Sequence, residues 1–432
     1  MVKNYETKYL IFKVSFFLFC LGTLADTMLV TDVNMGLFLV NLETPKIALI
    51  IYIVSFLIVS DFKFSKIFSD FDRKFTFLVF LILISGLISV YLSDERKASF
   101  KILLNYLSYF VCFLISLYYS NYFKEARNFI VKTFLAVNFV LILSCLADYY
   151  LPSFNQFLIN NFGHAELKHS FFEVNDVKYL RPSGFLSETN LTGLSIALSL
   201  LILIINYSNI RNKILLYGYV LFSGYTFGML GSRSTSIMIL ICSVLFLIFK
   251  KVDYKTVLKI LLVFFLVQVF TPQTRIRLAQ MFDKERMKEE AAIGRFMIWK
   301  GAVKAFEEHP VTGLGPGMFF FKSLYYIDKT VTDRVSFDRM EKNMANPHNI
   351  FLAFASEQGI IGILLFIALL IFVFFNLIKK KKYFSLSIFL GIMFASGLSS
   401  YAPYFKYYLI ICIIVYILSQ SEFYLEETGK IE

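Results

Sequence analysis

Long, unbroken blocks of apolar residues constrain this chain more than any other feature of its sequence. The blocks run for roughly 17–25 residues, the length of helix that crosses a hydrocarbon layer about 30 Å thick. Only 17% of the residues are charged, whereas a soluble domain has about a quarter of its residues charged. Because a backbone inside a bilayer must satisfy its own hydrogen bonds, such blocks form helices. The sequence therefore predicts an all-α polytopic membrane protein.

About twelve blocks qualify as transmembrane helices. The predicted spans are 9–30, 37–60, 75–93, 100–120, 127–149, 190–207, 213–230, 232–249, 256–271, 349–378, 384–399 and 402–420. No internal repeat or low-complexity linker separates them, so residues 1–432 are expected to form a single membrane domain. An even number of spans places both termini on the same side of the membrane.

Lysine and arginine are unevenly distributed among the short loops between these spans. One alternating set of loops is rich in them: Lys63, Lys66, Arg73, Lys74, Lys124, Arg127, Arg211, Lys213, Lys250, Lys251, Lys255 and Lys379 to Lys382. The other set contains little beyond Arg96 and Lys97. Because cationic short loops remain in the cytoplasm, both termini are expected there. The net charge of +12 is then a sign of membrane topology, and nucleic acid is not an expected partner.

The same topology places two long segments, 150–189 and 272–348, outside the cytoplasm. The second segment, between the ninth and tenth spans, is too long to be a simple connection, and loops of that length are usually functional. Apolar residues recur at helical spacing from Glu285 to His309, and Pro310 ends the pattern. We therefore predict an amphipathic helix inserted in a large extracytoplasmic loop, lying along or dipping into the membrane surface.

Two arginines in outer segments could bind phosphate. Arg233 follows Gly231 and Ser232 at a tight junction between two spans, and Arg295 lies on the amphipathic helix. Either side chain could simply reach toward lipid headgroups. A guanidinium group among small hydroxyl residues also suits a bidentate contact with phosphate oxygens. Trp299, the only tryptophan, is a candidate interfacial anchor and substrate contact.

His348 lies where the outer loop re-enters the membrane, in the segment Asn346-Pro347-His348-Asn349. A single histidine is usually structural, but imidazole is also the natural proton acceptor near neutral pH. We predict that His348 lies at the depth of a lipid-linked headgroup, with Asn349 beside it as a candidate substrate contact.

Two further outer segments carry alternatives that the residues alone leave open. Arg181 and Glu188 are candidates for substrate binding, or else a loop ion pair followed by a helix N-cap. The glycine-rich segment 313–317 is interpreted as a tight turn after a helix, with a weaker alternative in which its N–H groups approach a phosphate. No strand precedes it, which argues against nucleotide binding.

Five segments in order resemble the O-antigen ligase and O-antigen polymerase superfamily. They are Arg181-Pro182-Ser183-Gly184-Phe185 with Glu188 and Asn190, Gly231-Ser232-Arg233, Arg295-x-x-x-Trp299, Phe306 to Gly315, and Pro347-His348-Asn349 followed by Glu357-Gln358-Gly359-Ile360-Ile361-Gly362. Each motif alone is weak, whereas the order, the spacing and the long loop agree together. Thr189 departs from the proline that often stands in the corresponding family sequence.

The resemblance implies a GT-C-like fold and glycan transfer from an undecaprenyl-diphosphate-linked oligosaccharide on the outer face of the bacterial cytoplasmic membrane. It implies no cofactor and no essential metal. It makes Arg233, Arg295 and His348 the expected catalytic residues, with Arg181, Glu188, Asn349 and Trp299 as expected substrate contacts. Membrane lipids, a chain-length regulator and a flippase would be the other partners.

Three functions fit these expectations to different degrees. A polymerase that joins lipid-linked repeat units into O-antigen or capsule-like polysaccharide is favoured, mainly by the segment Ser187-Glu188-Thr189-Asn190. A ligase that transfers finished polymer to a lipid A core or another acceptor would use the same donor chemistry. A transporter of lipid-linked sugars would be expected to show inverted repeats and broken helices near the membrane midplane, and the sequence shows neither.

Overall fold

The computed structural model describes residues 2–24, 29–34, 39–61, 73–123, 125–161, 171–174, 177–186, 188–249, 252–281, 291–327 and 347–398. For some of these residues, Arg295 among them, it describes the backbone and not the side chain.

Helices make up most of the described chain. The apolar ones are α1 Val2–Leu24, α2 Thr44–Val59, α3 Arg73–Leu92, α4 Arg96–Tyr122, α5 Ala126–Tyr150, α8 Thr189–Ile205, α9 Lys213–Leu230, α10 Arg233–Ile248, α11 Tyr254–Gln268, α17 Ile350–Lys379 and α18 Tyr383–Leu398. Each overlaps one predicted span, while the span at 402–420 lies outside the described residues. Within the described ranges, five helices are long and apolar enough to cross a membrane, namely α1, α3, α4, α5 and α17. The chain is thus a helical membrane protein.

The predicted ends of the first two spans were wrong. α1 ends at Leu24 and α2 begins at Thr44. Between them, β1 (Leu29–Asn34) and β2 (Leu39–Glu43) form an antiparallel hairpin. Apolar residues in these strands extend the hydropathy of both flanking helices, so composition alone does not separate strand from helix there. A second antiparallel hairpin consists of β3 (Phe171–Val174) and β4 (Val177–Leu180).

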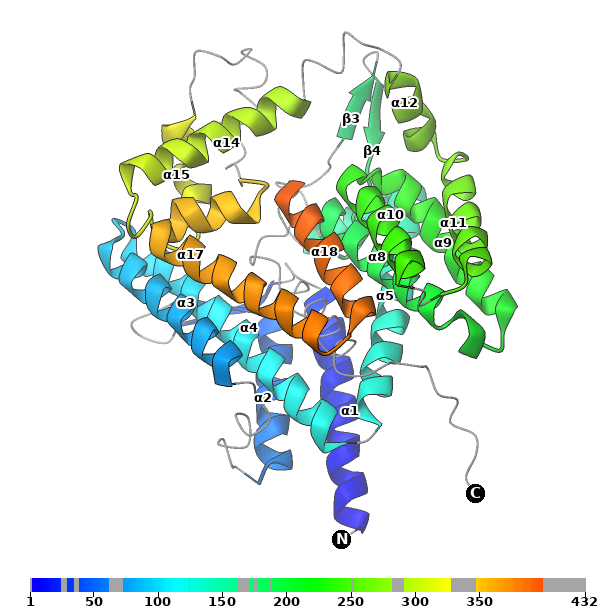
Figure 1. Ribbon diagram of the computed structural model, residues 1–432, viewed down its shortest axis with the longest axis horizontal. Coiled ribbons are helices and arrows are strands. Elements are labelled where there is room, and N and C mark those ends of the chain that lie inside the picture. The colour runs from blue at the N-terminus through cyan, green and yellow to red at the C-terminus, as the bar shows by residue number, and fades with distance from the viewer. Residues whose placement is uncertain are drawn as a thin grey trace.

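The segments between the apolar helices contain short helices of their own. These are α6 Pro152–Asn161, the 3-10 turn η2 Tyr207–Asn209, α12 Pro272–Met281, α14 Ala291–Glu308 and α15 Met318–Tyr326. α12, α14, α15 and the β3–β4 hairpin lie at the end of the molecule opposite the N-terminus (Figure 1). A helix, α14, is present where the sequence predicted one, and it ends just before Pro310 as expected. Residues 282–290, where the prediction begins, lie outside the described ranges.

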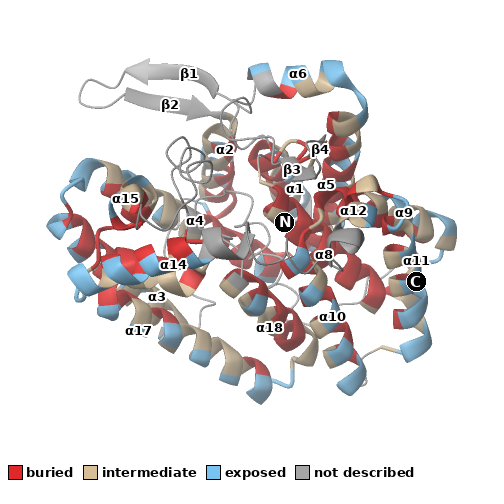
Figure 2. Cartoon of the chain, turned by 90° about the horizontal axis from the view of Figure 1, so that it is seen from above, coloured by how far each residue is buried: buried red, intermediate tan, exposed pale blue. Residues whose placement is uncertain are grey.

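The core lies around α8, whose residues are all buried except Asn190 and Ile205. Inside it, the Ser195 hydroxyl donates to Asn138 Oδ1 of α5 over 2.6 Å, a polar contact of the kind that joins membrane helices. Figure 2 shows exposed residues on the outer sides of α10, α11 and α17. Many of them are large and apolar, such as Leu262 and Phe375. A periphery of this kind suits contact with lipid.

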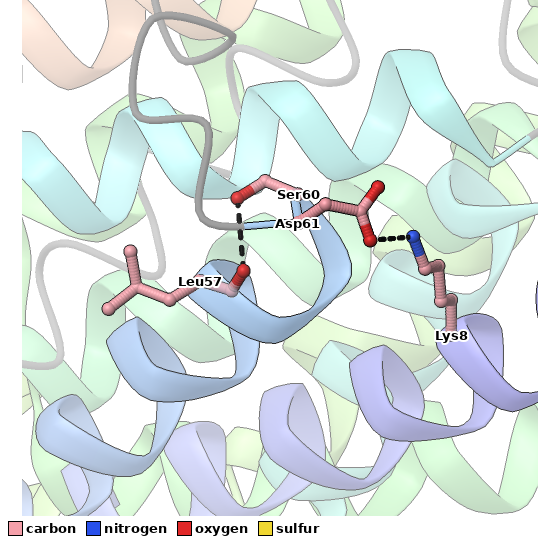
Figure 3. Close-up of polar contacts among 4 residues, drawn as sticks. All are labelled: Lys8, Leu57, Ser60 and Asp61. Atoms are coloured by element: carbon pink, nitrogen blue, oxygen red, sulfur yellow. Dashed lines mark hydrogen bonds and ion pairs between the residues drawn. The ribbon is translucent and has the colours of Figure 1, made fainter.

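The α1–α2 hairpin is closed at the N-terminal end of the molecule by an ion pair (Figure 3). Lys8 Nζ lies 2.6 Å from Asp61 Oδ1, and the lysine side chain is only 12% exposed. Asp61 follows α2 with a φ of 56°, a left-handed conformation that aspartate tolerates better than most residues. The pair holds the N-terminal part of α1 against the end of α2.

α17 is not one continuous helix, although the sequence predicted an uninterrupted span. Gly359 interrupts it with φ 65° and ψ −162°, a conformation available almost only to glycine. The first part, residues 350–358, follows its N-cap Asn349, and the second part continues to Lys379. α14 and α15 lie beside the outer end of this broken helix (Figure 1).

Candidate functional site

The segment that follows β4 is tied to two helices. Arg181 Nε donates to the carbonyl oxygen of Leu230 at the end of α9, over 2.7 Å. The amides of Ser183 and Gly184 both donate to Asp148 Oδ2 of α5, at 3.0 and 3.2 Å. Gly184 has a φ of 62°, and a Cβ atom there would lie 2.3 Å from Ser144 Oγ. The segment is therefore seated tightly on the end of α5.

Glu188 is the N-cap of α8, which was one of the two readings left open by the sequence. Its carboxylate accepts from the amide of Leu191 at 2.6 Å and from Asn190 Nδ2 at 2.9 Å. Burial raises the pKa of Glu188, and the hydrogen bonds together with nearby Arg181 oppose that rise. A half-buried carboxylate that accepts two hydrogen bonds is suited to organise the helix start.

The beginnings of α8 and α10 lie side by side. The Ser232 hydroxyl donates to Asn190 Oδ1 at 3.3 Å, and a Cβ on Gly193 would lie 3.2 Å from the Ser232 side chain. Ser232 is the N-cap residue of α10, yet its side chain does not cap the backbone. Arg233, the first residue of α10, is exposed. Thus the structure brings the Arg181, Glu188 and Arg233 segments together.

The position of Arg233 is electrostatically unusual. A cation at a helix N-terminus is opposed by the positive end of the helix dipole. Backbone N–H groups and a guanidinium group on the same end together form a strongly electropositive site. Such a site becomes favourable when it binds an anion, and phosphate oxygens match both kinds of donor.

His348 and Asn349 lie at the beginning of α17. Asn349 Oδ1 accepts from the amides of Phe351 and Leu352, at 2.9 and 3.1 Å. Its Nδ2 donates to the carbonyl oxygen of Gly397 in α18, at 3.0 Å. The structure therefore gives Asn349 a capping and anchoring role. His348 precedes it, half-buried and with a left-handed φ of 51°.

α18 connects the two parts of the site, because it packs against both α10 and α17. Cys242 Sγ of α10 donates to the carbonyl oxygen of Ser387, over 3.2 Å. Four residues earlier in α10, Met238 lies beside Gly391, where a Cβ would be 3.0 Å from the methionine side chain. Residue numbers thus fall along α10 as they rise along α18, so the two helices are antiparallel.

The antiparallel packing of α10 and α18 places the starts of α10 and α17 at a similar height along the bundle. Since an α-helix rises about 1.5 Å per residue, Arg233 lies about 7.5 Å beyond Met238 along α10. By the same measure, Gly397 lies about 9 Å beyond Gly391 along α18. Gly397 is the residue that binds Asn349. The N-termini of α10 and α17, with Arg233 and His348, therefore lie at nearly the same level.

α14 brings the remaining candidates toward the start of α17. Its residues Met297 and Ile298 belong to a buried cluster against which Leu352 of α17 packs. Arg295 lies one turn before them on α14, although its side chain lies outside the described atoms. Trp299 is half-buried, and its indole Nε1 is a buried donor with no partner among the described atoms. The backbone thus places Arg295 near the His348 end of α17.

Sequence reasoning missed two buried carboxylates that shape this region, Asp148 and Glu357. Asp148 stands at the end of an apolar helix, 35 residues before its partner Ser183. Glu357 lies inside a long apolar block, where a lone acid signals function or a tertiary partner. The intramembrane position of Glu357 was a usable signal, whereas the partner of Asp148 could come only from the fold.

Replacing Asp148 with alanine should loosen the segment that carries Arg181 and Glu188. The amides of Ser183 and Gly184 would lose their acceptor, and a buried unsatisfied donor costs about 1–3 kcal/mol. We expect a lower thermal unfolding midpoint in detergent, together with increased proteolysis at residues 181–188. Asp148→Asn keeps one acceptor oxygen and should show a smaller effect. Equal stability of all three proteins would contradict the anchoring role.

Comparison with known proteins adds one finding. The sequence profile of the family described as O-Antigen ligase matches residues 218–367. A search of the curated proteins finds no match. The matched range contains Arg233, Arg295, Trp299, His348 and Asn349, while Arg181 and Glu188 precede it. The resemblance that the sequence motifs indicated is thereby confirmed.

Proposed function

Since this membrane protein carries the matched region of the O-antigen ligase and polymerase superfamily, we propose that it is a polymerase of lipid-linked glycans. Its donor would be an oligosaccharide on undecaprenyl diphosphate, and its acceptor a sugar hydroxyl of another lipid-linked repeat unit. One observation carries the proposal: the starts of α8 and α10 touch, and α18 holds the start of α17 so that Arg233 and His348 lie at nearly the same level.

The two arginines act on the leaving group. When the bond between the anomeric carbon and the diphosphate oxygen breaks, negative charge develops on the diphosphate. Arg233, at the electropositive N-terminus of α10, stabilises that charge, and Arg295 on α14 adds a second cation. Preorganised cations act most strongly where water is excluded. The place of Arg233 at a helix N-terminus supports this role, because the helix dipole opposes a cation there and a bound anion offsets that opposition.

His348 acts on the acceptor. The acceptor hydroxyl oxygen attacks the anomeric carbon, its proton passes to the imidazole, and undecaprenyl diphosphate departs with the bonding electron pair. A positioned general base of this kind contributes about 10²–10⁴-fold. Attack in one step from the face opposite the leaving group inverts the anomeric carbon. The reaction as proposed uses no metal and no cofactor.

The site would face away from the cytoplasm. Short-loop charges predict cytoplasmic termini, and α12, α14 and α15 lie at the end of the molecule opposite the N-terminus (Figure 1). At that end, in the bacterial cytoplasmic membrane, the enzyme would meet lipid-linked sugars that a flippase has already delivered. A chain-length regulator would be a further partner.

A ligase remains the second candidate, because the matching family is described as O-Antigen ligase. The segment Glu188-Thr189-Asn190 favoured a polymerase at the level of sequence, yet it forms a helix cap in the structure. Both enzymes would use the same arginines and histidine on the donor. The acceptor alone distinguishes them.

Deletion of the gene followed by gel analysis of surface glycan tests the proposal. Loss of a polymerase should leave acceptors that carry a single repeat unit. Loss of a ligase should leave bare acceptors, with polymer retained on the lipid carrier. Complementation with the intact gene should restore the full ladder of chain lengths. Surface glycan that is unchanged by deletion would exclude both functions.

A further inference from the structure

The break in α17 leaves backbone groups that another segment satisfies. In a continuous helix the amide of Ile360 would bond to Ser356, but here it donates to the carbonyl oxygen of Pro310 over 2.8 Å. The carbonyl oxygens of Ser356 and Glu357 accept instead from the amides of Leu314 and Gly315, each over 2.9 Å. Because unsatisfied backbone groups are costly in a membrane protein, the break and the loop depend on each other.

The glycines of this loop permit the close contact. A Cβ on Gly313 would lie 2.3 Å from the carbonyl carbon of Glu357, and a Cβ on Gly359 would lie 2.3 Å from that of Val311. Gly313, Gly315 and Gly317 all have positive φ angles. The glycine-rich segment is therefore a turn, as predicted, and its backbone is hydrogen-bonded to that of α17. We call residues 310–317 together with Ser356, Glu357, Gly359 and Ile360 the α17 clamp.

Glu357 contributes to the clamp through its side chain as well as its backbone. The side chain is buried, with the residue 4% exposed, and Oε2 accepts from the amide of Gly317 over 2.8 Å. Gly317 is the N-cap residue of α15. The Glu357 carbonyl oxygen also accepts from Ser89 Oγ of α3, over 2.7 Å. One residue thus ties together α3, α15 and the break in α17.

The clamp joins the two helices that carry expected catalytic residues. α14 ends at Glu308, just before the clamp, and Arg295 lies 13 residues back along it. The first part of α17 ends at the clamp, and His348 lies just before its first turn. At about 1.5 Å per residue, Arg295 is roughly 20 Å from the clamp along α14. If α14 tilted by about 5° about its clamp end, Arg295 would move by roughly 2 Å.

We propose that Glu357 is a positioning residue that fixes α14 relative to α17, and thereby Arg295 relative to His348. This inference rests on the proposed glycan transfer. Glu357 is bonded to the amides of Gly315 and Gly317 in the loop, so we expect its effect to pass through Arg295. Misplacement of a catalytic group by about 1 Å can cost about 10²-fold in rate. Glu357→Ala should therefore lower the turnover number by about 10–100-fold, with a smaller change in stability than in rate.

A double-mutant cycle in the full-length protein tests the inference. The proteins are purified into lipid nanodiscs and supplied with a polyprenyl-diphosphate-linked oligosaccharide as donor and acceptor. Arg295→Ala alone should lower transfer by about 10²–10³-fold. On that background, Glu357→Ala should cost less than about threefold more, because the group that it positions is already absent. Glu357→Gln keeps an acceptor for the Gly317 amide and should retain most activity.

Gln358→Met is the matched control. Gln358 is the next residue of α17, is equally buried, and its Oε1 has no partner among the described atoms. The control should leave both transfer and hydrogen exchange at Gly315 and Gly317 unchanged, whereas Glu357→Ala should speed that exchange. If the alanine variant does not accumulate in membranes, Glu357→Asp, whose carboxylate is one methylene too short, takes its place.

The outcomes separate two kinds of failure. Full additivity of the Arg295 and Glu357 losses would overturn the positioning role, as would normal turnover in Glu357→Ala. Normal transfer in Arg295→Ala would instead overturn the assignment of Arg295 in the proposed function. Coupled losses would support the inference, provided that hydrogen exchange at Gly315 and Gly317, fast in Glu357→Ala, returns to the slow parental rate in Glu357→Gln.

Discussion

Replacing His348 with asparagine should lower glycan transfer by about 10²–10⁴-fold, the usual contribution of a general base. Asparagine tolerates the left-handed φ of 51° at this position, so the beginning of α17 should keep its shape. The Asn349 cap and its bond to Gly397 should also persist. The loss should therefore fall on the turnover number, with donor binding nearly unchanged. Release of polyprenyl diphosphate from the purified protein measures it.

His309 provides the control for this substitution. It follows α14, is exposed, and accepts from the Gly313 amide only through its backbone carbonyl oxygen. His309→Asn should leave turnover within about twofold of the parent protein, since exposed substitutions away from special features have small effects. Normal turnover in His348→Asn, with normal protein levels, would remove the assignment of His348 as the base.

Replacing Arg233 with alanine should lower transfer by about 10²–10³-fold, comparable to the loss of one preorganised oxyanion donor. The same change should not harm α10, because it removes a cation from a helix N-terminus, where cations are unfavourable. We expect the variant to be at least as thermally stable as the parent while being far less active. Arg233→Lys keeps the charge without the planar fork and should recover only part of the rate.

Arg96 offers a matched comparison for Arg233. It too is the exposed first residue of a helix, α4, and its guanidinium lies 5.2 Å from the ring centroid of Tyr91. In the described residues, no hydrogen bond joins the start of α4 to the start of another helix, whereas Ser232 joins the start of α10 to that of α8. Arg96→Ala should therefore leave transfer unchanged, measured as turnover at saturating donor. A comparable loss in both variants would mean that general surface charge, and not a phosphate site, explains the effect of Arg233.

The sequence predicted the positions of the helices well where apolar blocks are long and bounded by charge. α5, α9 and α17 match predicted spans to within a few residues. Prediction was wrong where two kinds of apolar structure adjoin: the β1–β2 hairpin was assigned to the helices on either side. The interruption at Gly359 was also missed, since a single glycine in an apolar block hardly changes its mean hydropathy.

The sequence proposed residues for the candidate site but gave nothing of its geometry. The motifs identified Arg233 and His348, but nothing in their spacing shows that α18 sets both at one level. Asn349 was predicted to contact substrate, and for Glu188 the sequence left a substrate contact and a helix cap open; in the structure their side chains cap α17 and α8. Caps and contacts use the same residue types, so only the fold separates the two roles. Asp148 and Glu357 act through partners far away in the sequence, so their partners could come only from the fold, although a lone acid inside an apolar block already marked Glu357.

The central claim is that this protein forms glycosidic bonds by one-step displacement of a lipid diphosphate. Purified protein in nanodiscs, supplied with a polyprenyl-diphosphate-linked oligosaccharide of known anomeric configuration, tests it most directly. We predict one polyprenyl diphosphate released for each glycosidic bond formed, with the anomeric carbon inverted in the product as observed by NMR. Retained configuration, or no bond formation with intact donor and acceptor, would contradict the account.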